Sequence, residues 1–359
     1  MKSSIIQFKF LKTALLGSLL LGFVFSSCKK DSTPPIPPAD KIALAAAIAT
    51  AQGFSDNSVE GTKPGQYEVG SKAALNAALA ASKLINADTK ASQTSVNNTV
   101  AQLLAAIAAY QAKFIKEIAE ANLIGFWKLN GNANDSSGKG NNGTAKAGHP
   151  FYGAGSLVSS ADRFGRANMA YTFDKGSNIE VPYTANLNPQ QMTISLWCNK
   201  TTAGRTVNAD TYTFLSLNRW NAYKFQLQSG NLTFFTVKAV KAVGDTAYHD
   251  RDDAGVALTN GTWYHVVVTY KPGQMDFYIN GDLVKSWTNT PGTALSIAAN
   301  PVNFVIGQDL PTSKYLTVDG DFQVAWGGFF TGAMDDVMFY NIALDGPQIK
   351  SIYNNQKTL

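Results

Sequence analysis

Paired carboxylates are the side chains of this 359-residue chain whose spacing bears most directly on catalysis. Hydrolysis of a glycosidic bond usually needs two carboxyl groups that flank the scissile bond. After residue 121 the sequence has one glutamate, Glu180, while aspartates gather at 250–253 and at Asp335-Asp336. Neighbouring residues of a strand point to opposite faces, so we expect Asp335 and Asp336 not to flank one bond. The 250–253 cluster is typical of a solvated polar loop, and the sequence disfavours a glycoside hydrolase.

Histidine and cysteine offer no alternative chemistry. His149, His249 and His265 lie far apart in the sequence and lack the ligand spacing of a transition-metal site. No Gly-x-Ser-x-Gly nucleophile elbow is present. We interpret His265 as a hydrogen-bonded strand residue, and Cys198, which alternates with apolar residues, as a small buried hydrophobe.

Aromatic residues in polar surroundings suggest carbohydrate recognition instead. Exposed rings stack on sugar faces, and nearby amides and carboxylates bind hydroxyls. Three segments that we expect to be loops carry such residues. The ligand-binding candidates are Trp220, Tyr223, Tyr248, His249, Asp309, Tyr315 and Trp326. Covering an edge of the core explains each of these side chains equally well.

The elements that position these residues change in type along the chain. From Leu123 onward apolar residues recur with period two, and Asn280-Gly281 is a strong hairpin signal. Residues 264–270 are apolar on both faces, as in a central strand. Many short strands with glycine and asparagine turns predict an all-β sandwich over residues 121–359. Residues 345–353 predict a short closing helix with Asp345 as its N-cap.

Residues 41–120 have helical periodicity and predict three helices. The longest apolar stripe runs from Val96 through Tyr110 to Ile118. Thr94 or Ser92 is the candidate cap of this helix, and Ser71 is the candidate cap of the middle helix. The polar loop that precedes Ser71, with Tyr67 in it, resembles the FIVAR three-helix modules of bacterial surface proteins. That resemblance implies a spacer, with sugar or host-protein binding as the alternative.

Residues 1–27 predict a signal peptide, in which a basic start precedes a short apolar run. Phe25-Ser-Ser-Cys28 resembles a bacterial lipobox, which implies cleavage before Cys28 and lipidation of that residue. Several acyl chains would anchor the protein firmly. An ordinary signal peptide with an incidental cysteine is the alternative. Residues 28–40 contain four prolines and predict an extended tether.

Several segments of the β region together resemble a known family. In order, they match the laminin-G-like branch of the concanavalin A-like lectin/glucanase superfamily. They are Phe126-Trp127, 135–143, 163–166, 193–197, 263–270, 278–281, 305–309 and 332–341. The resemblance implies a jelly-roll sandwich in which the first and last strands are neighbours.

A structural Ca²⁺ near these two strands is implied by the same resemblance. The oxygen-rich turn 134–142 and a carboxylate placed on an apolar face supply candidate ligands, because calcium takes six to eight oxygens and an unpaired buried carboxylate is costly. The candidates are Asp135, Asn142 and Asp335. Simple hydrogen bonding of Asp335 is an equal alternative.

Composition limits the partners. The formal net charge is +5, part of it in the signal peptide, and no dense basic stripe remains, so we expect no nucleic-acid partner. The lipobox together with these domains resembles Bacteroidetes-type surface lipoproteins that bind glycans. We therefore predict a non-catalytic lectin-like lipoprotein of the outer membrane, with outer-membrane protein partners. The sequence does not decide between the cell-surface face and the periplasmic face of that membrane. A protein-binding adhesion module is the first alternative, and an unusual glycoside hydrolase is the second.

Overall fold

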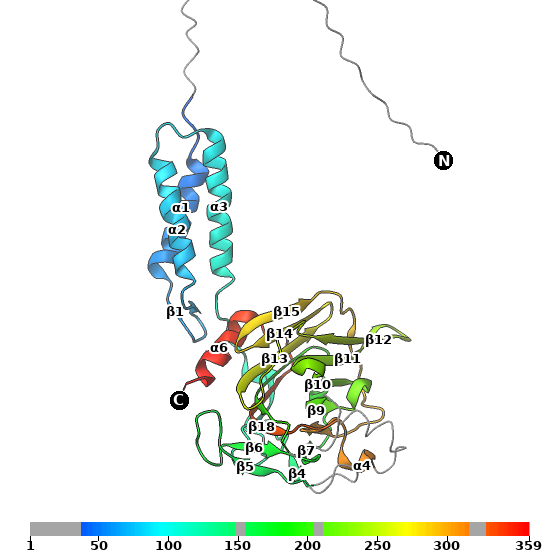
Figure 1. The fold of residues 1–359 in the computed structure, drawn as a ribbon. Coiled ribbons are helices and arrows are strands. Elements are labelled where there is room, and N and C mark those ends of the chain that lie inside the picture. The colour runs from blue at the N-terminus through cyan, green and yellow to red at the C-terminus, as the bar shows by residue number, and fades with distance from the viewer. Residues whose placement is uncertain (1–36, 148–154, 204–210, 316–327, 359) are drawn as a thin grey trace, which may run out of the picture.

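The structure is a computed structural model, and it describes residues 37–147, 155–203, 211–315 and 328–358 (Figure 1). The described chain begins with a helical module followed by a larger β-sandwich. The module comprises α1 (Ile42–Asn57), α2 (Lys72–Ala87), α3 (Gln93–Gln111) and a short parallel pair, β1 (Glu60–Gly61) with β2 (Tyr67–Glu68). No helix in these ranges combines the length and apolar content needed to cross a bilayer.

Two details of the module differ from the sequence-based expectation. Of the two candidate caps of α3, Ser92 caps the helix, since its side chain accepts a hydrogen bond from the Ser95 backbone, while Thr94 lies inside the helix. The side chain of Ser71 makes no capping bond to α2; instead Glu60 Oε1 accepts the Lys72 N–H at 2.6 Å. The predicted stripe to Ile118 is too long, because α3 ends at Gln111 and the chain then runs extended to pair with the β1–β2 loop.

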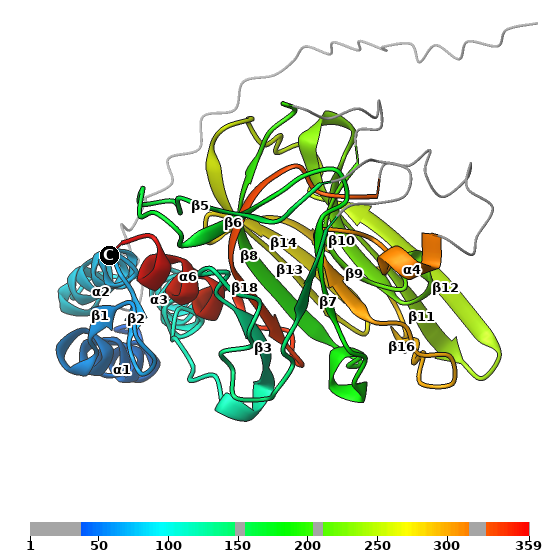
Figure 2. The same cartoon turned by 90° about the horizontal axis from the view of Figure 1, so that it is seen from below.

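The sandwich consists of two antiparallel sheets (Figure 2). We call them the β9 sheet and the β13 sheet. The β9 sheet has the order β12 (Asp245–Asp252), β11 (Leu232–Ala242), β10 (Tyr223–Gln228), β9 (Tyr212–Leu217), β17 (Phe304–Ile306), β7 (Asn178–Val181) and β4 (Thr144–Lys146), with β16 (Thr293–Ala294) on β11. The β13 sheet has the order β15 (Asp282–Trp287), β14 (Gln274–Ile279), β13 (Trp263–Lys271), β8 (Met192–Lys200), β18 (Gly332–Tyr340), β6 (Ala170–Phe173) and β5 (Val158–Ser160), with β3 (Leu123–Trp127) on β18.

Local sequence signals explain this topology. Asn280 and Gly281 both have positive φ and close the β14–β15 hairpin, as predicted. The apolar strand β13 lies centrally between β8 and β14. The first and last strands of the domain pair, since Val337 lies opposite Trp127. The jelly-roll class predicted from the sequence is therefore confirmed.

The core lies between the two sheets. Its centre is aromatic, with Phe304 stacked on Trp127 at 5.5 Å and on Phe339 at 5.9 Å between ring centroids. Successive side chains of β10 and β11 point to opposite faces of the sheet, and those on the inner face, which include Phe225 and Phe235, enter this core. Polar neighbours such as Lys224 and Thr236 must therefore face away from it.

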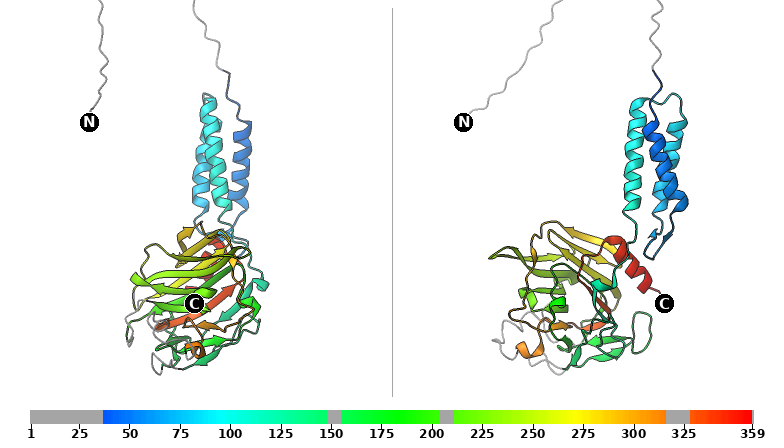
Figure 3. Two further views of the ribbon diagram at one scale, coloured as in Figure 1. Left: turned by 90° about the vertical axis from the view of Figure 1, so that its right-hand side faces the viewer. Right: turned by 180° about the vertical axis from the view of Figure 1, so that it is seen from behind.

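The closing helix α6 (Gly346–Gln356) joins the two parts. Asp345 and Gln348 form a complete capping box at its start. Ser351 and Asn355 of α6 bond to the backbone oxygen of Thr62 in the module, and Lys116 pairs with Asp345 at 2.9 Å. The module consequently stands as a rod on one end of the sandwich, with the start of α1 at its far end (Figure 3).

Candidate functional site

The strongest candidate site is a groove on the outer face of β10, β11 and β12. Its volume is about 540 Å³. We call it the Trp220 groove, and it is lined by Thr211, Trp220, Lys224, Gln226, Gln228, Phe234, Thr236, Tyr248 and Asp250. Strand register places Lys224 opposite Thr236, and Thr236 opposite Asp250, in one row across the floor. These strands lie on the side of the sandwich away from the module (Figures 1 and 2).

Two aromatic rings form the walls of the groove. Trp220 is partly exposed and belongs to a tight turn in which Asn218 and Arg219 both have positive φ. Tyr248 on β12 is 48% exposed. Cationic groups accompany both rings, with Lys224 Nζ 5.5 Å from the Trp220 centroid and Lys238 Nζ 5.1 Å from that of Tyr248. Such rings offer flat apolar faces beside hydrogen-bonding groups.

The floor carries polar atoms without protein partners. Gln226 Oε1 and Thr236 Oγ1 are buried and accept or donate no hydrogen bond within the structure. Both residues line the groove. Buried polar groups are nearly always satisfied in proteins, so each such orphan calls for a partner. A ligand with hydroxyl groups would supply it.

A buried ion pair holds the Trp220 turn in place. Arg219 Nε lies 2.6 Å from Asp309 Oδ2, and both side chains are almost completely buried. The hydroxyl of Tyr315, at the end of α4 (Thr312–Tyr315), donates to the other oxygen of Asp309. Burial raises the pKa of Asp309, while Arg219 and Lys224 oppose that rise. Because left-handed backbone is strained in residues other than glycine, we infer that this cluster stabilises the turn.

Trp220 also borders a second cavity of about 530 Å³. Asn218, Pro301, Leu310 and Lys314 contribute to its lining. The indole therefore stands between two hollows. An extended ligand in the Trp220 groove has room to continue past the ring.

The sequence candidates divide between groove and interior. Trp220 and Tyr248 line the groove as expected of binding residues. Tyr223 and Tyr315 are buried instead, and the buried Asp309 forms an ion pair with Arg219. His249 is buried, with its Nε2 2.8 Å from the Pro291 oxygen. Trp326 lies outside the described residues.

Tyr223 and His249 were expected to be exposed in loops, and the positions of the strands explain why they are buried. Residues 223 and 248–250 lie in strands β10 and β12 rather than in loops. Alternation then sends Tyr223 and His249 inward while Tyr248 and Asp250 face out. Lys224, Gln226 and Thr236 were missed because polar residues in a strand usually indicate a solvated face. Their period-two spacing along β10 and β11 is the signal that could have found them.

The carboxylates considered for hydrolysis have structural roles. Asp335 and Asp336 were expected to point apart, but both bind Arg163, at 2.5 Å and 2.9 Å. A β-bulge between Asp335 and Met338, with Asp336 at φ 46°, turns the second carboxylate toward the same guanidinium. Burial and the charge of Asp336 raise the pKa of Asp335 to about 7 despite Arg163. Glu180 accepts the Thr312 N–H at 3.0 Å.

The side chains proposed for calcium make hydrogen bonds and an ion pair within the protein. Asp135 accepts hydrogen bonds from the backbones of Phe126, Ser137 and Asn141, which lower its pKa against the effect of burial. Asn142 Oδ1 accepts the Asp135 N–H at 2.9 Å. Asp335 is held by a guanidinium, a partner that replaces a cation. Within the described ranges no three acidic, histidine or cysteine side chains gather as a metal site.

His265 and Cys198 behave as structural residues. His265 Nε2 lies 2.8 Å from Ser195 Oγ, and burial lowers its pKa to about 3. Burial raises the pKa of the Cys198 thiol far above its usual range. Both side chains are buried in the core, and the unionised thiol is a weak nucleophile.

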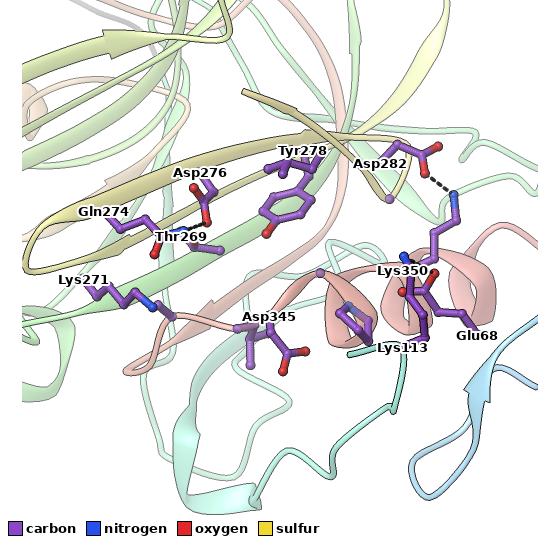
Figure 4. Close-up of a pocket in the computed structure, with 16 residues that line it drawn as sticks. Glu68, Lys113, Thr269, Lys271, Gln274, Asp276, Tyr278, Asp282, Asp345 and Lys350 are labelled. Carbon is purple, nitrogen blue, oxygen red and sulfur yellow. Dashed lines mark hydrogen bonds and ion pairs between the residues drawn. The ribbon is translucent and has the colours of Figure 1, made fainter. Parts of the chain in front are cut away.

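Another cavity, of about 400 Å³, lies at the seam between the module and the β13 sheet (Figure 4). Its charged groups largely pair with one another. Lys350 binds Asp282 at 2.7 Å, and Lys113 binds Glu68 at 3.3 Å. Asp276 accepts hydrogen bonds from Gln274 and Ser286. We interpret the seam as part of the joint between the two parts.

Comparison with known proteins shows what the chain is similar to in sequence and in fold. A gellan lyase from a Bacillus species is 42% identical over 81 residues, which are 23% of this chain but only 3% of that protein. The fourth domain of an extracellular arabinanase from Geobacillus stearothermophilus, solved with arabinotriose, is 21% identical. It covers 66% of this chain and 100% of that one, with a TM-score of 0.46.

The receptor-binding domain of a botulinum neurotoxin of mosaic serotype C/D is 17% identical, with a TM-score of 0.45 over 66% of this chain and 51% of that one. Residues 173–350 match the family described as the concanavalin A-like lectin/glucanases superfamily, within its laminin-G group. The match includes the strands β8 to β18 that surround the core and build the groove. Over residues 173–350 the sandwich therefore resembles a laminin-G-like domain of the concanavalin A-like lectin/glucanases superfamily.

Proposed function

We propose that this protein is a non-catalytic carbohydrate-binding protein and that the Trp220 groove is its binding site. One observation carries the proposal. The partly exposed ring of Trp220 and the exposed ring of Tyr248 flank a floor on which Gln226 Oε1 and Thr236 Oγ1 lack partners among the described residues. Rings bind the apolar faces of sugars, and the floor atoms bind their hydroxyls.

The absence of catalysis is part of the proposal. Among the described residues that line the Trp220 groove, Asp250 is the one carboxylate. Glycoside hydrolysis generally uses a carboxylate pair about 5–10 Å apart. We accordingly propose binding without hydrolysis.

The proposal also places the protein on the outer membrane. It is supported by the sequence Phe25-Ser-Ser-Cys28, by the proline-rich stretch after it and by the rod-like module. Residues 1–36 lie outside the described structure. A lipid on Cys28 would put the start of α1 near the membrane and the sandwich farther out.

The test is binding of a soluble protein that starts at residue 37 to a glycan array, followed by calorimetry on each positive glycan. Trp220→Ala and Tyr248→Ala are each expected to weaken binding about tenfold or more, or about 1.4 kcal/mol, because truncation of a central aromatic removes most of its contact energy. The matched control is Phe126→Ala, a partly exposed ring on the β13 sheet. Equal loss in all three variants, or a blank array, would count against the Trp220 groove. Release of new reducing ends from a bound glycan would contradict the non-catalytic assignment.

A further inference from the structure

We propose that the Trp220 groove recognises an acidic sugar and that Lys224 binds its carboxylate. The ligand class is a polysaccharide that contains uronic acid residues. This inference rests on the proposed function and specifies its ligand.

Lys224 is the observation that carries the inference. It is 7% exposed on strand β10, yet it lines the groove. Its ammonium group makes no hydrogen bond and no ion pair with any described residue; its near neighbour is the ring of Trp220. An ammonium removed from water is costly unless an anion or hydrogen-bond acceptors compensate it. The buried position therefore suits a group that gains its partner when a ligand binds.

The charged groups near Lys224 do not form an ion pair with its ammonium group. Asp309 is close enough to favour the charged lysine, but its carboxylate is bound by Arg219 and Tyr315. Asp250 lies two strands away on the exposed edge of the row, beyond Thr236. Burial lowers the pKa of Lys224, and Arg219 lowers it further, while Asp309 and Asp250 oppose both effects. A ligand carboxylate would supply the compensation that these paired or distant groups do not.

The rest of the floor selects a sugar acid over a simple anion. Gln226 Oε1 can only accept hydrogen bonds, so it requires a donor from the ligand. A hydroxyl provides one, and an isolated sulfate does not. One lysine is a point charge that suits a singly charged carboxylate, without the bidentate fork of an arginine. Together, Lys224 and Gln226 require an anionic oxygen and a hydroxyl in one ligand, which is the chemistry of a uronic acid.

The experiment compares each acidic polysaccharide with its own carboxyl-reduced form. Polygalacturonate, alginate and glucuronoxylan are titrated by calorimetry at low and at physiological salt. For at least one of the three we expect the acidic form to bind about tenfold or more tightly than the reduced form, with an advantage that shrinks as salt screens the charge. Lys224→Met should abolish this advantage, so that the acidic and the reduced form bind with equal affinity. Lys224→Arg keeps the charge and should retain most of the preference.

Two further variants sharpen the comparison. Asp250→Asn should strengthen binding of the acidic form, because it removes a like charge from the same row. Lys271→Met removes an exposed lysine from the opposite sheet and should change nothing.

The outcomes separate the two proposals. If acidic and reduced forms bind equally, or if Lys224→Met keeps the preference, the carboxylate assignment is wrong while carbohydrate binding stands. A sulfated glycan that binds more tightly than all three polyuronates would also overturn it. If neither these polymers nor any neutral glycan on the array binds, the proposed function itself fails.

Discussion

At the scale of single residues, the sandwich contains carboxylates whose environments differ sharply. Asp135 and Asp162 are bonded by N–H groups that lower their pKa. Asp335 shares one guanidinium with Asp336 in a buried site, and its pKa rises to about 7. The attraction of Arg163 is thus outweighed by burial and by the second negative charge.

This difference predicts how stability depends on pH. A carboxyl group whose pKa is raised from 3.8 to about 7 on folding contributes stability that is full below about pH 4 and is lost as the pH rises through about 7. Thermal unfolding of the wild type from pH 4.5 to 7.5 should show this decline. Asp335→Asn should flatten it, since a neutral amide does not titrate. Asp336→Asn, the control, should shift the decline to lower pH. A curve for Asp335→Asn parallel to the wild type would contradict the assignment.

Only some of the candidate residues predicted from the sequence line the Trp220 groove. Trp220 and Tyr248 were identified because aromatic rings among polar residues stand out. Tyr223 was assigned to a loop because nothing local reveals that its hydroxyl donates to Leu187 O inside the core. The same difficulty hid Lys224, since a lysine in a strand ordinarily faces water. Burial is set by pairing with distant strands, which local patterns do not record.

At the scale of elements, caps and turns define where helices and strands end. The Asn280-Gly281 hairpin and the Asp345 capping box were predictable because their chemistry is confined to a few neighbouring residues. The bulge at Asp335 was not, because it depends on how β18 fits against β8. Ser71 was the wrong cap for α2 for a similar reason. The true acceptor, Glu60, comes from the β1 strand.

The α2 cap can be tested directly. Glu60→Ala is expected to destabilise the module by about 1 kcal/mol, because the Lys72 N–H and Ser71 hydroxyl lose their acceptor. Ser71→Ala should have a smaller effect, since Ser71 donates to Glu68 O and caps no helix. Urea unfolding followed by helical circular dichroism measures both. Greater destabilisation by Ser71→Ala would restore the sequence-based cap.

At the scale of the whole molecule, the module and sandwich are joined through contacts on both chain segments that meet there. Residues 113–115 tie the end of the module to β2 and the loop before it, Lys116 pairs with Asp345, and α6 bonds to Thr62. Ile118 and Leu344 belong to one small apolar cluster beneath this joint. The Trp220 groove and the start of α1 therefore lie at well-separated ends of one continuous structure (Figure 1).

The anchor predicts a specific labelling result. When the full chain is expressed in a bacterium grown with radiolabelled palmitate, the wild type should carry label and sediment with membranes. Cys28→Ser should lose both properties. Cys198→Ser is the matched control, because that thiol is buried and un-ionised, and it should keep the label. Label retained by Cys28→Ser would contradict lipidation at that residue.

The rod shape of the module has a consequence for the space that the groove can search. The 19-residue helix α3 sets a rod length of about 28 Å at 1.5 Å per residue. An extended tether over residues 28–40 adds up to about 40 Å. A sandwich anchored in this way would move through a shell several nanometres deep, pivoting at the tether but keeping a fixed angle to its rod. Neighbouring copies would thus sweep overlapping volumes and could hold one long polymer at several points, so that retention would grow with surface density.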